Sequence, residues 1–147
     1  MQLQILGSGG PGASGGRASA SYLLWIDGTG RILVDAGSGT KDQFHRAGGN
    51  FDDIELVALS HLHPDHAAEL PAILWPAGGR FSLSGPSAGG VFPSIDAFVD
   101  RLFGPNGAFR ILADRIEVEA ITVDVSGTGA VEVWDDGAVA VRGTGVP

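Results

Sequence analysis

The sequence predicts one layered domain of the α/β or α+β class. Its 147 residues, 44% of them hydrophobic, suffice for one compact core, and this length argues against two domains. Apolar runs of strand length open and close the chain, and segments with apolar residues at helical spacing lie between them. Glycine is abundant, and together with eight prolines it marks many tight connections. No repeat or low-complexity segment interrupts this order.

The first part of the chain predicts three strands, a helix and a buried strand. The stretch DGTG is a hairpin signal between two apolar runs. A glycine pair suited to a helix C-cap follows the helical stretch, and the run IELVALS has the continuous apolar character of a buried strand. In order, the predicted elements are strands at 3–6, 19–26 and 31–37, a helix at 40–48 and a strand at 54–60.

The second part predicts two helices and strands of alternating polarity. A short helix can form over 70–75 with Pro71 in its first turn, and apolar residues from Ile95 to Leu102 recur at helical spacing. Residues 115–125 alternate between apolar and acidic side chains, as in a strand with one exposed face. The predicted elements are helices at 70–75 and 94–104 and strands at 80–86, 115–125 and 130–143, the last a hairpin turning at Asp136 and Gly137.

Composition excludes several kinds of site and environment. Without cysteine the chain cannot form a disulfide or a thiolate metal site, so any metal must bind imidazole and carboxylate. No stretch has the roughly 18 apolar residues of a membrane span, and the N-terminus lacks a signal-peptide pattern, so we expect a cytoplasmic protein without membrane partners. The net charge is −8, and seven acidic residues from Asp114 onward are balanced only by Arg115 and Arg142. This acidity predicts poor binding of nucleic acid.

The segment SHLHPDH at 60–66 contains three of the four histidines. In an extended segment His61 and His63 point to the same side, and a turn at the following proline brings Asp65 and His66 toward the same volume. Imidazole and carboxylate suit zinc, with iron or manganese as alternatives. A bound divalent ion would lower the pKa of its water to about 7 and so generate hydroxide at neutral pH.

Two other residues, His45 and Ser60, carry weaker functional hypotheses. His45 stands alone in a helical stretch, where packing is the simpler role. Ser60 directly precedes His61, but no histidine is free to act as its base, so we do not expect a serine nucleophile.

The pattern H-x-H-x-D-H after an apolar strand resembles the signature of the metallo-β-lactamase superfamily. ILVDAGSGT at 32–40 resembles the upstream strand of that family, which ends in an aspartate, here Asp35. The glycine-rich opening, and the stretch HLHPDHAAELPAIL, resemble the ribonuclease Z-like branch. The resemblance implies an α/β fold of the αββα type, a sandwich of two sheets flanked by helices. This chain would form one half of it plus additional strands.

The resemblance also implies a site for two zinc ions. His61 and His63 would bind the first ion, Asp65 and His66 the second, and Asp35 would hydrogen-bond a metal ligand and fix its orientation. Asp65 would in addition be the catalytic residue that orients or deprotonates the water. No helix pattern follows the glycine-rich opening, so we expect no nucleotide-binding loop and no organic cofactor.

Some ligands that the resemblance implies are missing from this sequence. Members of the family carry a further histidine for the first metal, a bridging aspartate and a last histidine, yet no histidine follows His66. We therefore expect 1–147 to be one domain, incomplete at its C-terminus, with Pro147 just before the next metal histidine. Such a chain alone would be inactive. Its uncovered sheet face should pair with a second copy, as a homodimer, or with another chain.

Three functional hypotheses remain open. The first is a metal-dependent hydrolase that directs a zinc-activated hydroxide at an ester or phosphodiester. The second is a non-catalytic fragment or half-domain that associates with a partner. The third is an iron-dependent oxidoreductase of the same superfamily. For the hydrolase, the acidic late strands favour a small-molecule or ester substrate over nucleic acid.

Overall fold

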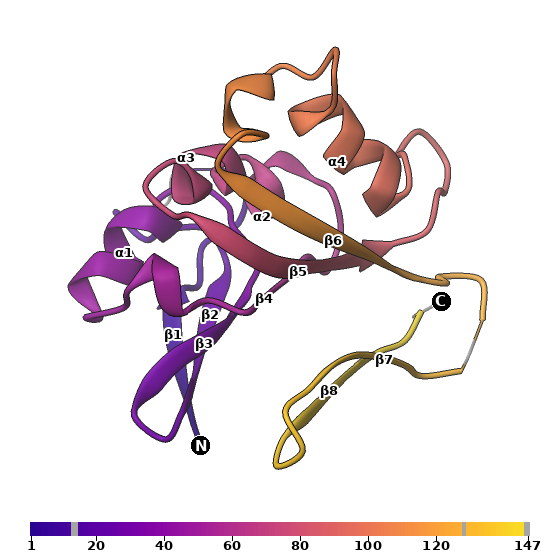
Figure 1. Cartoon of the computed structure of the whole chain (residues 1–147). Coiled ribbons are helices and arrows are strands. Elements are labelled where there is room, and N and C mark those ends of the chain that lie inside the picture. Colours follow the sequence, from indigo (N-terminus) through magenta and orange to yellow (C-terminus); the bar gives the residue numbers. More distant parts are fainter. Residues whose placement is uncertain (13–14, 128, 146–147) are drawn as a thin grey trace.

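The fold consists of a six-stranded sheet, a separate two-stranded sheet and several short helices (Figure 1). The computed structural model describes residues 1–12, 15–127 and 129–145. The strands are β1 (Gln2–Gly7), β2 (Ser21–Ile26), β3 (Thr29–Val34), β4 (Leu56–Ala58), β5 (Gly79–Pro86), β6 (Ile116–Val123), β7 (Val131–Asp135) and β8 (Ala140–Gly143). The helices are α1 (Thr40–Arg46), α2 (Pro64–Ala67), α3 (Leu70–Leu74) and α4 (Ile95–Phe103), with 3-10 turns η1 (Phe51–Asp53) and η2 (Arg110–Leu112).

The strands of the large sheet lie in chain order, from β1 at one edge to β6 at the other. β1, β2 and β3 pair antiparallel, whereas β3, β4, β5 and β6 pair parallel. Parallel strands end at the same edge of a sheet, so the segments that leave β3 and β4 meet there. Asp35 directly follows β3, and His61 follows shortly after β4. The topology therefore brings two predicted site residues together.

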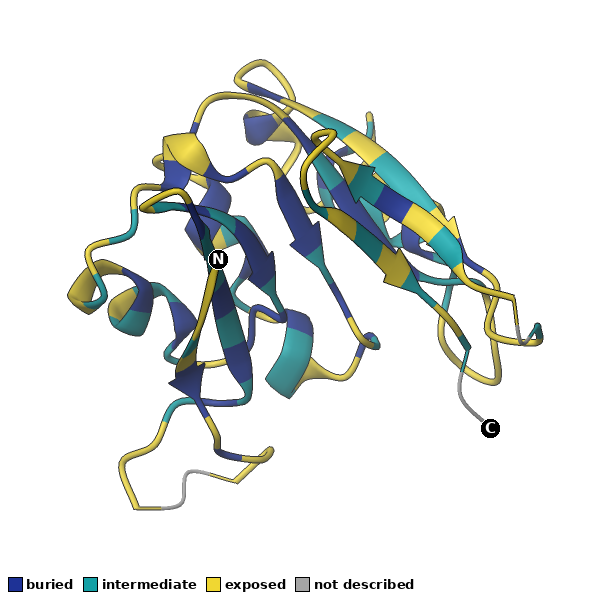
Figure 2. Ribbon diagram, turned by 90° about the horizontal axis from the view of Figure 1, so that it is seen from below, coloured by how far each residue is buried: buried dark blue, intermediate teal, exposed yellow. Residues whose placement is uncertain are grey.

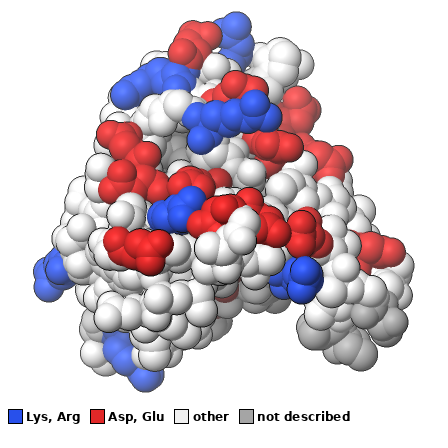
Figure 3. Space-filling model, turned by 60° about the horizontal axis from the view of Figure 1, so that its bottom comes forward, with Lys and Arg blue, Asp and Glu red and all other residues white. Residues whose placement is uncertain are grey.

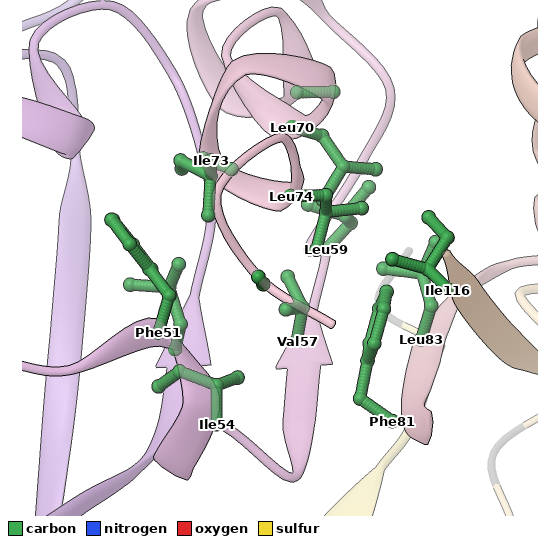
Figure 4. Packing of buried hydrophobic residues seen from close by; sticks show 14 of the residues in the cluster. Phe51, Ile54, Val57, Leu59, Leu70, Ile73, Leu74, Phe81, Leu83 and Ile116 are labelled. Atoms are coloured by element: carbon green, nitrogen blue, oxygen red, sulfur yellow. The ribbon is translucent and has the colours of Figure 1, made fainter. Parts of the chain in front are cut away.

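Two apolar cores join three layers, because neighbouring residues of the central strands point to opposite faces. On one face Val57 of β4 belongs to the core shared with the helices, and Figure 4 shows α3 packing on this side through Leu70 and Ile73. On the other face Leu56 belongs to the core shared with the β7–β8 sheet, to which β7 contributes Val133. The ribbon coloured by burial shows the central strands as largely buried (Figure 2). The buried strand predicted over 54–60 is confirmed, over the shorter span Leu56–Ala58.

Arg31 of β3 ties the β7–β8 sheet to the large sheet. Its guanidinium donates hydrogen bonds to Glu55, with Nε 2.7 Å from Oε1, and to the carboxylate of Asp136 in the β7–β8 turn. It also lies over the ring of Trp134, 5.0 Å from the centroid. The carboxylates of Glu55 and Asp136 raise the pKa of Arg31, so its charge is permanent. The hairpin is thus held by charge as well as by its apolar face.

The loop after β3 packs directly against the segment that begins at α2. Ala36 N donates to His66 O at 2.7 Å, and Glu69 N donates back to Ala36 O at 2.9 Å. At Gly37 the two backbones touch, since a Cβ there would lie 1.7 Å from Asp65 O. Only glycine fits this contact. The close approach fixes where α2, with its predicted ligands, stands relative to the end of β3.

The α/β prediction is confirmed, and its differences from the structure lie at element ends. The strand predicted over 31–37 ends at Val34, because Asp35 turns the chain with a left-handed φ of 61°. The turn expected after His63 is a single helical turn, α2, with Pro64 at its first position. On the outer strand β1, Leu3 and Ile5 remain 65% and 63% exposed. No helix within the described ranges is long and apolar enough to cross a membrane.

Replacing Arg31 with Met should loosen the β7–β8 sheet, because methionine keeps an apolar side chain but removes both ion pairs. We expect faster hydrogen–deuterium exchange of the β7 and β8 amides and unchanged exchange in β2 and β5. Arg80→Met is the matched control, since the Arg80 side chain is 63% exposed and its ion pairs among the described residues are with Glu117 and Glu119 on the neighbouring strand β6. Unchanged hairpin exchange in Arg31→Met would mean that apolar packing alone holds this sheet.

Replacing Gly37 with Ala should displace α2. The added methyl group meets the backbone of Asp65, which cannot rotate away, so we expect a loss of about 1–3 kcal/mol in the free energy of unfolding. Gly10→Ala is the control, because a Cβ there has no neighbour within 4 Å. Urea unfolding of both variants measures the difference. Equal stability of the two would show that the loops can separate freely.

Candidate metal centre

The four predicted metal ligands lie on one short segment at the end of β4. His63 is the N-cap residue of α2 with extended backbone (φ −65°, ψ 148°), so His61 and His63 precede the helix while Asp65 and His66 lie in its single turn. The rings of His61 and His66 are 4.0 Å apart between centroids, and those of His61 and His63 are 4.6 Å apart. The structure thus brings the predicted residues together.

Their donor atoms form two pairs. His61 Nε2 lies 3.0 Å from His63 Nδ1, and His66 Nε2 lies 3.5 Å from Asp65 Oδ2. Two ligands of one tetrahedral zinc ion, at bonds of about 2.05 Å, are separated by about 3.3 Å. Both separations are near that value. These are also the two pairs that the family resemblance assigns to two different ions.

Neither pair is a complete site. Among residues 1–12, 15–127 and 129–145, no three His, Asp or Glu side chains are grouped so that they could hold one ion. Catalytic zinc usually has three protein ligands. The geometry therefore fits two half-sites, each with imidazole or carboxylate donors of the kind that zinc binds, and each needing further ligands.

Asp35 contacts the histidine segment through hydrogen bonds with Ser60 and His66. Its carboxylate is buried, with 3% exposure, and accepts from Ser60 N at 2.8 Å and from Ser60 Oγ at 2.9 and 3.0 Å. His66 Nδ1 lies 2.8 Å from Asp35 Oδ2, one of the two oxygens that Ser60 Oγ also contacts. This contact leaves His66 Nε2 facing Asp65. The arrangement is the carboxylate–histidine pairing that orients metal ligands in proteins.

Burial and neighbouring charge both act on His61. Burial lowers the pKa of His61, and the nearby imidazoles of His66 and His63 lower it further. A lowered pKa favours the neutral ring, which is the form that binds a metal ion.

Sequence reasoning missed several residues that shape the site. Glu69 accepts from Gly39 N at 2.7 Å and from Lys41 N at 2.8 Å, so its carboxylate fixes the start of α1 beside the Asp35 loop. Phe92, in the loop after β5, packs edge-on against His63 with ring centroids 5.0 Å apart. These contacts join segments far apart in the chain, and no local pattern indicates them. Gly37 is the exception, because the glycine-rich run DAGSG at 35–39 is a local pattern that could have indicated a close backbone contact there.

A cavity of about 160 Å³ opens between the two sheets next to the histidine segment. Ser60 and Ser84 lie on one wall, and Arg142 and Gly143 of β8 lie on the other. The cavity reaches the histidine segment at Ser60, and the four predicted metal ligands are not among the residues that line it.

His45 does not take part in this cluster. It lies on α1, and its ring packs edge-on against Phe51 with centroids 5.1 Å apart. The packing role predicted for His45 agrees with this contact.

Comparison with known sequences identifies similar proteins. Residues 14–74 match the model of the metallo-beta-lactamase superfamily. Ribonuclease Z of Pyrobaculum arsenaticum is 32% identical over 145 residues, covering 93% of this chain and 47% of the relative. Ribonuclease Z of Kineococcus radiotolerans is 31% identical over 128 residues, covering 87% and 36%. This chain spans less than half the length of either relative.

Comparison with solved structures supports the fold. Human tRNase Z, short form, superposes with a TM-score of 0.70 at 21% identity, covering 98% of this chain and 60% of the other. A long-form RNase Z from yeast gives a TM-score of 0.58 at 22% identity, covering 88% and 19%. At such identities the likeness concerns the fold alone, and it confirms the predicted metallo-β-lactamase-like architecture.

The predicted preference for a small-molecule or ester substrate over nucleic acid is wrong, because these relatives are ribonucleases by name. That prediction rested on the acidic late strands. Glu117 and Glu119 lie in the amino-terminal half of β6, away from the strand ends where His61 stands, and both pair with Arg80. Acidic and basic side chains are intermixed on the face in Figure 3. The net charge of the whole chain therefore does not describe the charge near the histidine segment.

The matched family model, the two ribonuclease Z relatives and the shared fold lead to one conclusion. They confirm the predicted resemblance of this chain to the metallo-β-lactamase superfamily, in its ribonuclease Z-like branch.

Proposed function

We propose that this chain supplies metal ligands to a zinc-dependent hydrolase that cleaves a phosphodiester bond in RNA. The observation that carries the proposal is the pairing of donor atoms, His61 with His63 and Asp65 with His66, at separations near those of zinc ligands. The names of the relatives favour RNA, and tRNA in particular, as the substrate class.

The proposal assigns each pair to one ion, and the remaining ligands to polypeptide outside these 147 residues. Zinc is favoured because the donors are imidazole and carboxylate, the ligand types of hydrolytic zinc sites. When bound, zinc would lower the pKa of a water molecule and polarise the phosphoryl oxygen.

The residues of the chain then have distinct tasks. The Asp65 carboxylate, 12% exposed, stands beside His66 Nε2, where it can orient a water molecule or accept its proton. Asp35 holds the His66 ring by its Nδ1 edge. Phe92 packs on His63 at the exposed end of the segment and limits the rotation of that ring. The chain thus fixes the ligands before any ion binds.

His63→Ala should lower zinc binding at least about tenfold, because it removes one member of the first pair. His45→Ala is the matched control, since that histidine packs against Phe51 on α1. Zinc bound to the full-length protein, which would carry the remaining ligands, is measured by elemental analysis after equilibrium dialysis. Equal zinc binding by both variants and the parent would contradict the ligand assignment.

Asp65→Asn should abolish cleavage of a tRNA precursor with a 3′ extension by the full-length protein, while binding of that RNA persists. Asparagine keeps the shape of the side chain but cannot accept a proton. Cleavage is followed on denaturing gels and RNA binding by filter retention. A full-length protein that binds zinc but leaves RNA intact, or that holds iron and consumes oxygen, would overturn the proposed reaction.

A further inference from the structure

Ser60 occupies the centre of the hydrogen-bond network behind the metal ligands. Its Oγ lies 2.9 and 3.0 Å from the two carboxylate oxygens of Asp35 and 3.0 Å from His61 Nδ1. Its backbone N–H donates to the same carboxylate at 2.8 Å. Ser60 Oγ also lies 3.4 Å from His66 Nδ1, so one residue contacts the buried acid and two predicted ligands.

We infer that Ser60 is a positioning residue that passes the orienting effect of Asp35 on to His61. Through Ser60, Asp35 fixes which ring nitrogen of His61 is free to bind a metal. This inference builds on the proposed function, since it gives that site a second oriented histidine beside His66.

The positions of the protons follow from the distances. A serine hydroxyl can donate one hydrogen bond and accept two. With Ser60 Oγ within 3.0 Å of both Asp35 oxygens, the hydroxyl proton must point to the carboxylate, because two bare oxygen lone pairs at that distance would repel. Ser60 Oγ can then only accept from His61, so His61 Nδ1 carries the proton.

The consequence is that His61 and His66 adopt the same tautomer. His66 Nδ1–H donates directly to Asp35, and His61 Nδ1–H donates to Ser60, which donates to Asp35. Both rings then leave Nε2 unprotonated. Nε2 of His61 lies 3.0 Å from His63 Nδ1, from which it accepts a hydrogen bond in the metal-free chain, and Nε2 of His66 faces Asp65. One buried carboxylate thereby prepares one ligand in each half-site.

This network also explains why Ser60 is no nucleophile. Its hydroxyl proton is committed to Asp35, and one of its acceptor positions is committed to His61. A serine nucleophile instead needs a base that accepts its proton and an oxygen free to attack.

The test is long-range ¹⁵N–¹H NMR of the metal-free chain at a pH where the imidazoles are neutral. In the parent chain His61 should show a protonated Nδ1 and an unprotonated Nε2. In Ser60→Ala, His61 should populate both tautomers, while His66 keeps its Nδ1 proton through Asp35. Ser60→Thr keeps the hydroxyl and should restore the pattern of the parent.

Zinc affinity gives a second measurement. Ser60→Ala should weaken zinc binding about tenfold, as expected for loss of a group that orients a ligand, and Ser60→Thr should recover most of it. Ser84→Ala is the control, because Ser84 lies on β5 and lines the same cavity. Circular dichroism checks that each variant is folded.

The outcomes separate this inference from the proposed function. An unprotonated Nδ1 on His61 in the parent, or a His61 tautomer unchanged in a folded Ser60→Ala, would overturn the role of Ser60. The expected tautomers in a protein that binds no zinc would leave that role intact and refute the zinc site instead.

Discussion

The buried carboxylate of Asp35 is the constraint on which the rest of the site depends. A charge with 3% exposure is stable only when hydrogen bonds replace its water, and here three donors do so. Two of these donors belong to Ser60 and one to His66, so satisfying the acid determines where the histidine segment stands. The hydrogen bonds that stabilise the buried Asp35 carboxylate are therefore the same bonds that position the predicted metal ligands.

The parallel part of the sheet makes this arrangement possible. Asp35 N, just after β3, donates to Ala58 O at the end of β4, and Leu59 N, just after β4, donates to Ser84 O within β5, so the segments leaving β3 and β4 each stay hydrogen-bonded to the next strand. Residues separated by 25 positions in the sequence, Asp35 and Ser60, thereby become neighbours. The glycine contact at Gly37 then sets the distance between the two loops. An antiparallel connection at this point would have sent the second loop to the opposite edge.

Much of the fold could be predicted because it depends on local patterns. The hairpin at Asp27 and Gly28, both with positive φ, and the apolar run around Leu56 and Val57 are encoded within a few residues. The clustering of His61, His63, Asp65 and His66 could be predicted for the same reason, since these residues are nearly adjacent in the sequence. The roles of Ser60, Glu69 and Phe92 were not visible, because each depends on a partner from another segment. Ser60 suggests only a nucleophile in the sequence, whereas its hydrogen-bond partner Asp35 lies in the loop after β3.

The charge argument failed for a related physical reason. Net charge is a sum over the whole surface, whereas a site responds to the charges within about one Debye length, roughly 8–10 Å in physiological salt. The late acids are largely engaged locally: Asp136 with Arg31, Glu119 with Arg80, and Asp124 with the Ser126 amide. The ligand segment itself contains one acid, Asp65, and three imidazoles, and two divalent ions would make it strongly positive. An acidic chain can thus present a cationic centre to a phosphodiester, provided that its carboxylates are committed elsewhere.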